Sequence, residues 1–311
     1  MISVHQFELP EELLIVGAAV QKGLFDALRG KSLSLEELAD CTECDTRALW
    51  VVTEALMTMG YLEHEAEKIK LSQEAWDCFF NPDSKTYLNY SFMHTYNLLS
   101  VWLHLPEVLT TGRPVDRDRP KDSSKNFIAA MNHYAKEGAD DIVKFCLRGL
   151  PKDAKVLDVG GGPLTIAQAF ADAGAQVVVL DLPEVVDMMS PELDGSTPVS
   201  MVKGDFREGL PGNDYDMVYL GNLSHAYGEK ENRKLLSDAF KVLSPWGKVV
   251  INDFLRGTGR GAEVFAVNML VNTESGGTFS FAEYEAWLKD AGFVDISMHE
   301  TRENQFVVAK K

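Results

Sequence analysis

The chain has 311 residues, of which 47 are acidic and 30 are basic, so its formal net charge is −17 at pH 7. Proteins that bind nucleic acids neutralise phosphates with lysine and arginine, and this charge therefore argues against a polyanionic partner. With 45% hydrophobic and 25% charged residues, the composition is that of a globular protein with one large domain or two ordinary ones.

The N-terminus and the cysteines indicate a cytoplasmic protein. Residues 1–6 carry no basic stretch followed by an apolar one, so we expect no signal peptide. No apolar run approaches the roughly 18 residues of a membrane span. The four cysteines do not form a disulfide framework for so long a chain. Cys41 and Cys44 have the spacing of a zinc site, but no second pair of ligands accompanies them, so we expect no metal.

Residues 1–90 are typical of a winged helix. We predict a buried apolar helix over residues 10–30, a helix that begins with a Ser34–Glu37 capping box, a helix from Thr46 to about Met59 and a β-hairpin over residues 61–72. A DNA reader would present basic residues on the second helix of the motif, which offers only Arg47. These 90 residues hold seven basic and sixteen acidic side chains. We therefore predict a dimerisation domain, with a DNA-binding regulator as the alternative.

Residues 91–150 are predicted to be a helical linker that also forms part of a substrate pocket. They are rich in aromatic residues and methionine, among them Trp102, Met131 and Tyr134. Most such residues form ordinary core, but with the polar residues between them they could line a pocket for a flat organic molecule. The Pro-rich, charged segment from Gly112 to Lys125 is predicted to be a surface loop.

Residues 151–311 alternate between strand and helix patterns, which is typical of a parallel sheet covered on both faces. We predict helices from Glu229 to Leu243 and from Phe281 to Ala291. The predicted strands are 155–159, 176–180, 198–202, 215–220, 247–252, 294–299 and 305–309. The last two are separated by only five residues and should form a closing antiparallel hairpin.

A glycine loop follows the first of these strands. Asp158 and Val159 run directly into Gly160, Gly161 and Gly162, and a segment of helical composition follows. Glycines let the backbone approach a ligand closely, and a helix N-terminus offers free N–H groups, so this is half of a nucleotide site. Asp181 ends the next strand, where an acid could bind a ribose diol. A dinucleotide fold would need a third glycine where Thr165 stands, and the terminal hairpin also favours a methyltransferase sheet.

These motifs resemble the small-molecule O-methyltransferases, which include caffeic-acid-type plant enzymes and bacterial relatives acting on polyketides, carotenoids and pigments. VLDVGGGPL and VVVLDLPEV resemble the S-adenosylmethionine site of that family, and KGDFREGLP, LSHAYGEKENRKLL and SGGTFSFAEYEAWLKDAGF match in order. The resemblance implies an α/β Rossmann-like class I methyltransferase domain. Its seven-stranded sheet would end in an antiparallel hairpin and follow a winged-helix dimerisation domain that forms a homodimer.

The resemblance also implies how S-adenosylmethionine is bound. The two outer glycines would pass beneath its methionine part, Asp181 would accept both ribose hydroxyls, and Asp205 and Phe206 would contact the adenine. Alternatively, Asp181 caps the next helix and Phe206 belongs to the core. The expected cofactor-binding residues are Asp158, Gly160, Gly162, Asp181, Leu182, Asp205, Phe206 and Asn222.

His225 is the candidate general base. Methyl transfer needs an acceptor lone pair in line with the bond that breaks and a route by which the acceptor's proton leaves. His225 follows the fourth strand, at the sheet edge where ligands bind, and matches the family's base. Asp253 matches a family acid at the end of the fifth strand. A second acid is missing near Thr278, so we expect a less well oriented and less basic histidine.

The residues that match acceptor contacts of the family lie mainly before the SGG turn. They are Asn268, Met269 and Asn272, joined by Met131, and simple helix packing is the alternative interpretation. The leading hypothesis is methyl transfer to a hydroxyl of a small aromatic or polyketide-like molecule. The alternatives are C-, N- or S-methylation, a decarboxylase or hydroxylase of the same fold, and a regulator that senses S-adenosylmethionine through its winged helix.

Overall fold

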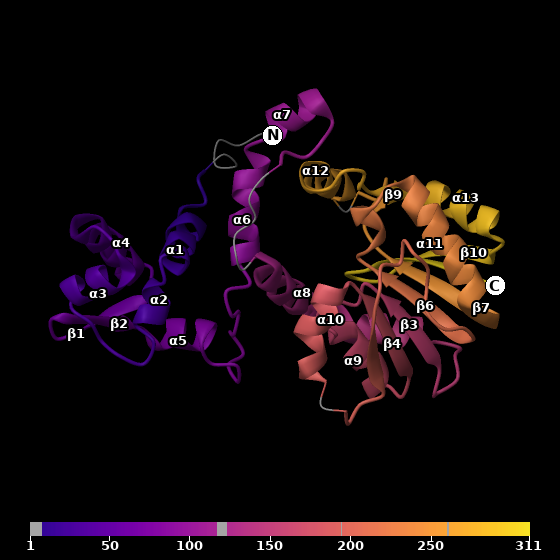
Figure 1. Cartoon of the computed structure of the whole chain (residues 1–311), viewed down its shortest axis with the longest axis horizontal. Helices are drawn as coiled ribbons and strands as arrows, with labels where there is room; N and C mark the ends of the chain where they lie inside the picture. The colour runs from indigo at the N-terminus through magenta and orange to yellow at the C-terminus, as the bar shows by residue number, and fades with distance from the viewer. Residues whose placement is uncertain (1–7, 117–122, 194, 260) are drawn as a thin grey trace. The chain divides into compact units, whose positions relative to one another are not determined.

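The computed structural model describes residues 8–116, 123–193, 195–259 and 261–311 (Figure 1). The chain divides into two compact units, Met1–Ser100 with Arg119–Ala130 and Val101–Asp118 with Met131–Lys311. We call them the N-terminal unit and the C-terminal unit. The domain boundaries predicted after residues 90 and 150 stay a prediction.

The N-terminal unit contains the predicted succession of two helices and a hairpin. Ser34 caps the first of these helices in a reciprocal capping box with Glu37, as predicted. The single helix predicted over residues 10–30 is wrong, because Gly23 breaks it with a left-handed φ of +72° that glycine adopts at little cost. The elements are α1 (Glu11–Gln21), α2 (Leu24–Ala27), α3 (Leu35–Thr42), α4 (Thr46–Thr58), β1 (Leu62–Glu65), β2 (Lys68–Leu71) and α5 (Gln73–Phe79).

The helical part of the chain over residues 75–150, which includes the linker predicted for residues 91–150, is interrupted. It contains the end of α5, then α6 (Met93–Trp102), α7 (Leu105–Thr111) and α8 (Ser123–Cys146). No helix covers residues 81–92, because Pro82 disfavours a helical conformation at Asn81 and has no N–H group. Of the loop predicted from Gly112 to Lys125, residues 117–122 lie outside the described residues, and the last three residues begin α8.

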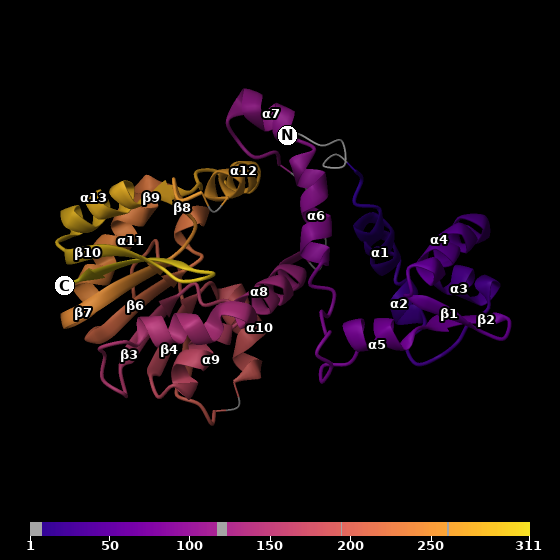
Figure 2. The same cartoon turned by 180° about the vertical axis from the view of Figure 1, so that it is seen from behind.

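The C-terminal unit contains a seven-stranded sheet with the strand order β10-β11-β7-β6-β3-β4-β5 (Figures 1 and 2). Neighbours are parallel from β7 to β5, whereas β11 is antiparallel to both β7 and β10, so the terminal hairpin is confirmed. The strands are β3 (Lys155–Val159), β4 (Gln176–Asp181), β5 (Val199–Lys203), β6 (Tyr215–Gly221), β7 (Leu243–Asn252), β10 (Val294–Glu300) and β11 (Gln305–Lys310).

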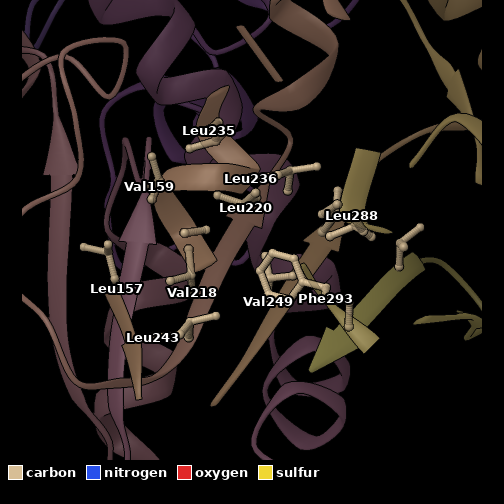
Figure 3. Close-up of a cluster of buried hydrophobic side chains, with 14 of the residues drawn as sticks. Leu157, Val159, Val218, Leu220, Leu235, Leu236, Leu243, Val249, Leu288 and Phe293 are labelled. Atoms are coloured by element: carbon tan, nitrogen blue, oxygen red, sulfur yellow. The ribbon is translucent and has the colours of Figure 1, made fainter. Parts of the chain in front are cut away.

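Helices cover both faces of the sheet because its strands are apolar on both sides. On one face, Leu157 and Val218 pack with Leu235 and Leu288, which lie on two of these helices (Figure 3). Val156 points to the other face, into a cluster that includes residues of α8. The helices of this unit are α9 (Thr165–Asp172), α10 (Pro183–Met189), α11 (Glu229–Val242), α12 (Ala262–Asn272) and α13 (Phe281–Ala291).

Two short 3₁₀-helices, η2 (Ser190–Glu192) and η3 (Ser224–Ala226), and the paired strands β8 (Leu255–Arg256) and β9 (Phe279–Ser280) complete the C-terminal unit. Within the described ranges, no helix combines the length and the apolar character that crossing a membrane requires.

Candidate active site

The glycine loop between β3 and α9 has a shape that only glycine permits. Gly160 and Gly162 have left-handed φ values of +73° and +42°. A Cβ added to Gly161 would lie 2.6 Å from Oδ2 of Asp158 and 2.8 Å from Cγ1 of Val179. The backbone of this loop therefore passes close to two buried side chains. The fold itself thus favours glycine at all three positions, through the left-handed φ of Gly160 and Gly162 and the close packing at Gly161.

Gly161→Ala is expected to lower the free energy of unfolding by about 1–3 kcal/mol, because Asp158 and Val179 are fully packed and have no room to move away. The midpoint of thermal unfolding measures this effect. Gly277→Ala is the matched control, since a Cβ added there meets no atom within 4 Å. An equal, small effect of both substitutions would contradict the packing described for the loop.

Asp181 connects the glycine loop to the next helix. Its Oδ2 accepts a hydrogen bond from the N–H of Gly162 at 2.8 Å, and its Oδ1 accepts one from the N–H of Leu182, which precedes α10, also at 2.8 Å. Burial raises the pKa of this carboxyl, and the two backbone N–H groups oppose that shift. Each oxygen keeps a lone pair for a further donor, so this arrangement is compatible with a bound diol.

Asp158 is the most unusual carboxyl of this region. It is 2% exposed, and its Oδ2 has no hydrogen-bond partner among the described residues. Burial raises its pKa to about 7, and the nearby carboxylate of Asp181 adds to the shift. An unpartnered buried carboxyl costs free energy unless a donor or a cation meets it, so the loop is suited to a positively charged ligand.

The other expected cofactor contacts have partners within the protein. Arg207 donates from Nε to both carboxylate oxygens of Asp205, at 3.0 and 2.9 Å, and lowers its pKa. The ring of Phe206 is buried and packs edge-on against Tyr227. Asn222 has a left-handed φ of +52°, and its N–H donates to the carbonyl oxygen of Asn252. The roles of Leu182, Asp205, Phe206 and Asn222 toward a cofactor stay predictions.

His225 and Asp253 form a buried pair at the carboxyl edge of the sheet. Nδ1 of His225 lies 2.7 Å from Oδ1 of Asp253, whose Oδ2 accepts from the backbone N–H of His225 at 3.1 Å. The histidine side chain is 12% exposed and the aspartate side chain 1%. Because a carboxylate only accepts, Nδ1 carries a hydrogen, and in the neutral imidazole the lone pair is then on Nε2. Asp253 thus orients the histidine, and the effect expected from the missing acid near Thr278 stays a prediction.

The SGG turn and two phenylalanines also hold His225, a function that sequence reasoning missed. Gly277 donates to the carbonyl oxygen of His225 at 2.8 Å, and a Cβ on Gly276 would lie 2.4 Å from that oxygen. The ring of Phe265 packs edge-on against the imidazole at a centroid distance of 4.9 Å, and Phe254 stacks on Phe265. Two sequence features could have indicated these contacts. They are the adjacent glycines Gly276 and Gly277, and Phe265, which lies one helical turn before Asn268.

Three of the expected acceptor contacts are joined by hydrogen bonds. Trp102 donates from Nε1 to Oδ1 of Asn268 at 3.2 Å, and Asn272 donates from Nδ2 to the same oxygen at 2.9 Å. Met269 is buried on the same helix, α12, whereas Tyr134 on α8 is 56% exposed. Met131 is half-buried on α8. Among the described residues, no His, Cys, Asp or Glu side chains group in threes or more in a way that could hold a metal ion.

The fold and this site define a class I S-adenosylmethionine-dependent methyltransferase, with a glycine loop after β3, an acid at the end of β4 and a terminal antiparallel hairpin. A family model for the O-methyltransferase domain matches residues 112–294, and the chain therefore belongs to that family. It is an O-methyltransferase that uses S-adenosylmethionine.

Relatives over nearly the full length agree with this assignment. The chain is 26% identical to the 8-O-methyltransferase of tetracenomycin polyketide synthesis from Streptomyces glaucescens, over 90% of this chain and 87% of that protein. It is 25% identical to the 3-hydroxy-5-methyl-1-naphthoate 3-O-methyltransferase of Streptomyces sahachiroi, over 90% and 85%. Its fold is similar to that of PigF with SAH, with a TM-score of 0.78 and 22% identity over 97% and 96% of the two chains.

The residues present fit S-adenosylmethionine. This cofactor carries a sulfonium, an ammonium, a carboxylate and a ribose diol. For the cations and the diol, the loop offers the unpartnered carboxyl of Asp158 and the accepting carboxylate of Asp181. The loop itself is a close backbone surface that a Cβ at Gly161 would disturb. The two carboxyl groups thus match the positive charges and the diol of the cofactor.

Proposed function

We propose that this enzyme methylates a hydroxyl of a small aromatic or polyketide-like molecule, with His225 as the general base. The pair of His225 and Asp253 carries this proposal, because Asp253 accepts from Nδ1 and so leaves Nε2 as the basic nitrogen of the neutral imidazole, at the edge of the sheet where ligands bind. The acceptor class is supported by relatives whose names give a polyketide and a naphthoate as substrates.

In this proposal, the residues of the site have the following roles. The glycine loop, Asp158 and Asp181 bind the cofactor, which when bound supplies an electrophilic methyl group on a sulfonium and leaves as the neutral thioether. Nε2 of His225 takes the hydroxyl proton as the oxygen–methyl bond forms, and the carboxylate of Asp253 stabilises the resulting imidazolium. Phe265 covers the imidazole and limits the access of water.

Incubation with S-adenosylmethionine labelled in its methyl group tests the proposal. Phenols, enols and quinols serve as acceptors, and the position of the label in each product is determined by NMR. We expect label on oxygen. Label on carbon, nitrogen or sulfur, or loss of carbon dioxide from an acceptor, would favour the corresponding alternative chemistry, and cofactor binding without transfer to any oxygen would contradict the proposal.

We also infer that the enzyme is a cytoplasmic homodimer that associates through its N-terminal helices and binds no nucleic acid or membrane. Support comes from apolar side chains that are exposed on these helices, Trp50 (54%) and Val51 (52%) on α4 and Leu14 (38%) on α1. A second copy of the chain would remove this apolar surface from water. The four free cysteines suit a reducing compartment.

Trp50→Glu combined with Val51→Glu is expected to give monomers at micromolar concentration, because two charges would be buried at the interface. Light scattering coupled to size exclusion measures the mass. Trp246→Glu is the control, since Trp246 is 86% exposed and belongs to the C-terminal unit. If the wild-type chain is itself a monomer, the inferred dimer is wrong.

A further inference from the structure

Asn232 is a buried polar residue of α11 among apolar neighbours. It is 2% exposed, and Leu235, Leu236 and Ala239 of the same helix belong to the core of the C-terminal unit. Figure 3 shows Leu235 and Leu236 next to Leu220 of β6. Burying an amide costs free energy unless it is hydrogen-bonded, so the partners of Asn232 indicate its function.

The carboxamide of Asn232 binds the turn that carries His225. Its Nδ2 lies 3.0 Å from the carbonyl oxygen of Ser224, 3.1 Å from that of Tyr227 and 3.0 Å from that of Gly228. Carbonyl oxygens only accept, so the NH₂ end of the amide faces them and donates. Ser224 begins η3 and Tyr227 follows it. One side chain of α11 thus holds the turn on both sides of His225.

Backbone groups support two of these three carbonyls as well. The N–H of Tyr227 donates to the carbonyl oxygen of Ser224 at 3.2 Å, and the N–H of Asn232 donates to that of Gly228 at 3.1 Å. The carbonyl oxygen of Tyr227, by contrast, is joined to the helix by the amide of Asn232. Loss of this amide would therefore loosen the turn just after His225.

The other contacts of His225 come from loops. Asp253, which directly follows β7, accepts from its Nδ1 and its backbone N–H, and Gly277, which precedes β9, donates to its carbonyl oxygen. Asn232 instead connects the turn to a helix that is anchored in the core. A base must lie within reach of the proton that it removes, and a misplacement of about 1 Å can lower a rate about 10²-fold.

We propose that Asn232 is a positioning residue of the methyl transfer. It holds the turn from Ser224 to Gly228 on α11 and so keeps Nε2 of His225 where it can take the proton of the acceptor. This role adds to that of Asp253, which sets the tautomer. The inference rests on the proposed general base and names a residue that acts only through it.

Asn232→Leu removes the donor and fills its space with a side chain of similar size. With a weakly acidic phenol, we expect kcat to fall roughly 10-fold, as for a modest displacement of the base. A phenol that is already ionised at the assay pH needs no base, so its kcat should stay near that of the wild type. Isothermal titration calorimetry should show that S-adenosylhomocysteine binds as before. The ratio of the two kcat values does not depend on how much of the variant is folded.

Ala239→Gly is the matched control. Ala239 is fully buried on the same helix, and glycine there weakens α11 without removing a contact to the turn. This control should lower the midpoint of thermal unfolding and leave the ratio of the two kcat values unchanged.

Asn232→Asp is a second variant of nearly the same shape. Its ionised carboxylate cannot donate to the three carbonyls, whereas the protonated carboxyl group can donate one hydrogen bond. The kcat of this variant relative to the wild type, with the weakly acidic phenol, should therefore recover in part as the pH falls. A role in packing alone would give no such recovery.

Asn232→Leu in the His225→Ala background is the decisive measurement. If Asn232 acts through the imidazole, its removal has no further effect once the imidazole is gone, so the two losses are not additive. Single-turnover rates of the wild type, both single variants and the double variant with the weakly acidic phenol measure this coupling.

Additive losses, an equal loss for both phenols, or wild-type rates for Asn232→Leu would each overturn the proposal. A large loss for His225→Ala with none for Asn232→Leu removes only the positioning by Asn232 and leaves the proposed function intact. Normal turnover of His225→Ala contradicts the proposed base itself, and the role of Asn232 is then wrong with it.

Discussion

His225→Ala is expected to lower kcat for a weakly acidic phenol by about 10²–10⁴-fold, the usual contribution of a general base, while S-adenosylhomocysteine still binds normally. The reason is that the variant leaves no group to take the hydroxyl proton. Single-turnover rates measure the loss, and isothermal titration calorimetry measures cofactor binding. Near-normal turnover would reduce His225 to a residue that merely positions the acceptor.

Asp253→Asn and His225→Gln test the two functions proposed for the His225–Asp253 pair, which are the orientation of the imidazole and the removal of the proton. Asn at position 253 can donate to Nδ1 as well as accept, so it permits the tautomer whose Nε2 carries a hydrogen and is no base. We therefore expect a large loss of kcat for Asp253→Asn as well. His225→Gln keeps a polar side chain of similar reach but supplies no base, so it should behave like the alanine variant. If the glutamine variant were active, hydrogen bonding rather than proton removal would be the function of this position.

Asp158→Asn is expected to raise the free energy of unfolding, and more so at high pH. The pKa of Asp158 is about 7 in the folded protein and 3.8 for an ordinary aspartate, so the folded state holds a proton that the unfolded state releases between these values. Stability from this group is therefore present below pH 4 and lost as the pH rises toward 7. The full shift corresponds to about 4 kcal/mol.

Thermal unfolding of both proteins without cofactor, at pH 5 and pH 8, measures this linkage. The midpoint of Asp158→Asn should exceed that of the wild type, with the larger gap at pH 8. Asp172→Asn, on the exposed side of α9, is the control. Asp158→Asn should also bind S-adenosylhomocysteine more weakly, and it should lack the rise in affinity that we expect of the wild type as Asp158 ionises. A gap that does not change with pH would contradict the raised pKa.

The features that sequence could predict depend on residues that are near in the chain. The alternation of apolar strands with helices, the Ser34–Glu37 capping box and the terminal hairpin all follow from local spacing. All three are present in the structure. The glycine loop was equally visible, because strand, glycines and acid occur within about 25 residues. Gly23 was a local signal that was missed, since a glycine within an apolar run is also compatible with an uninterrupted helix.

The remaining site features depend on tertiary contacts. His225 and Asp253 are 28 residues apart and meet because the parallel strands β6 and β7 end at the same sheet edge. Trp102 and Asn268 are separated by 166 residues, and their hydrogen bond depends on the packing of the α6–α7 region against α12. The family match of Asn268 and the aromatic-rich segment around Trp102 each pointed to the acceptor, but their hydrogen bond could be found only in the structure.

The most direct test of the general base compares acceptors of graded acidity. Single-turnover rates of the wild type and of His225→Ala are measured with a series of ring-substituted phenols of similar size. The ratio of the two rates should be large for weakly acidic phenols and approach one as the hydroxyl becomes acidic enough to ionise without help. A ratio that stays the same across the series would contradict proton removal by His225.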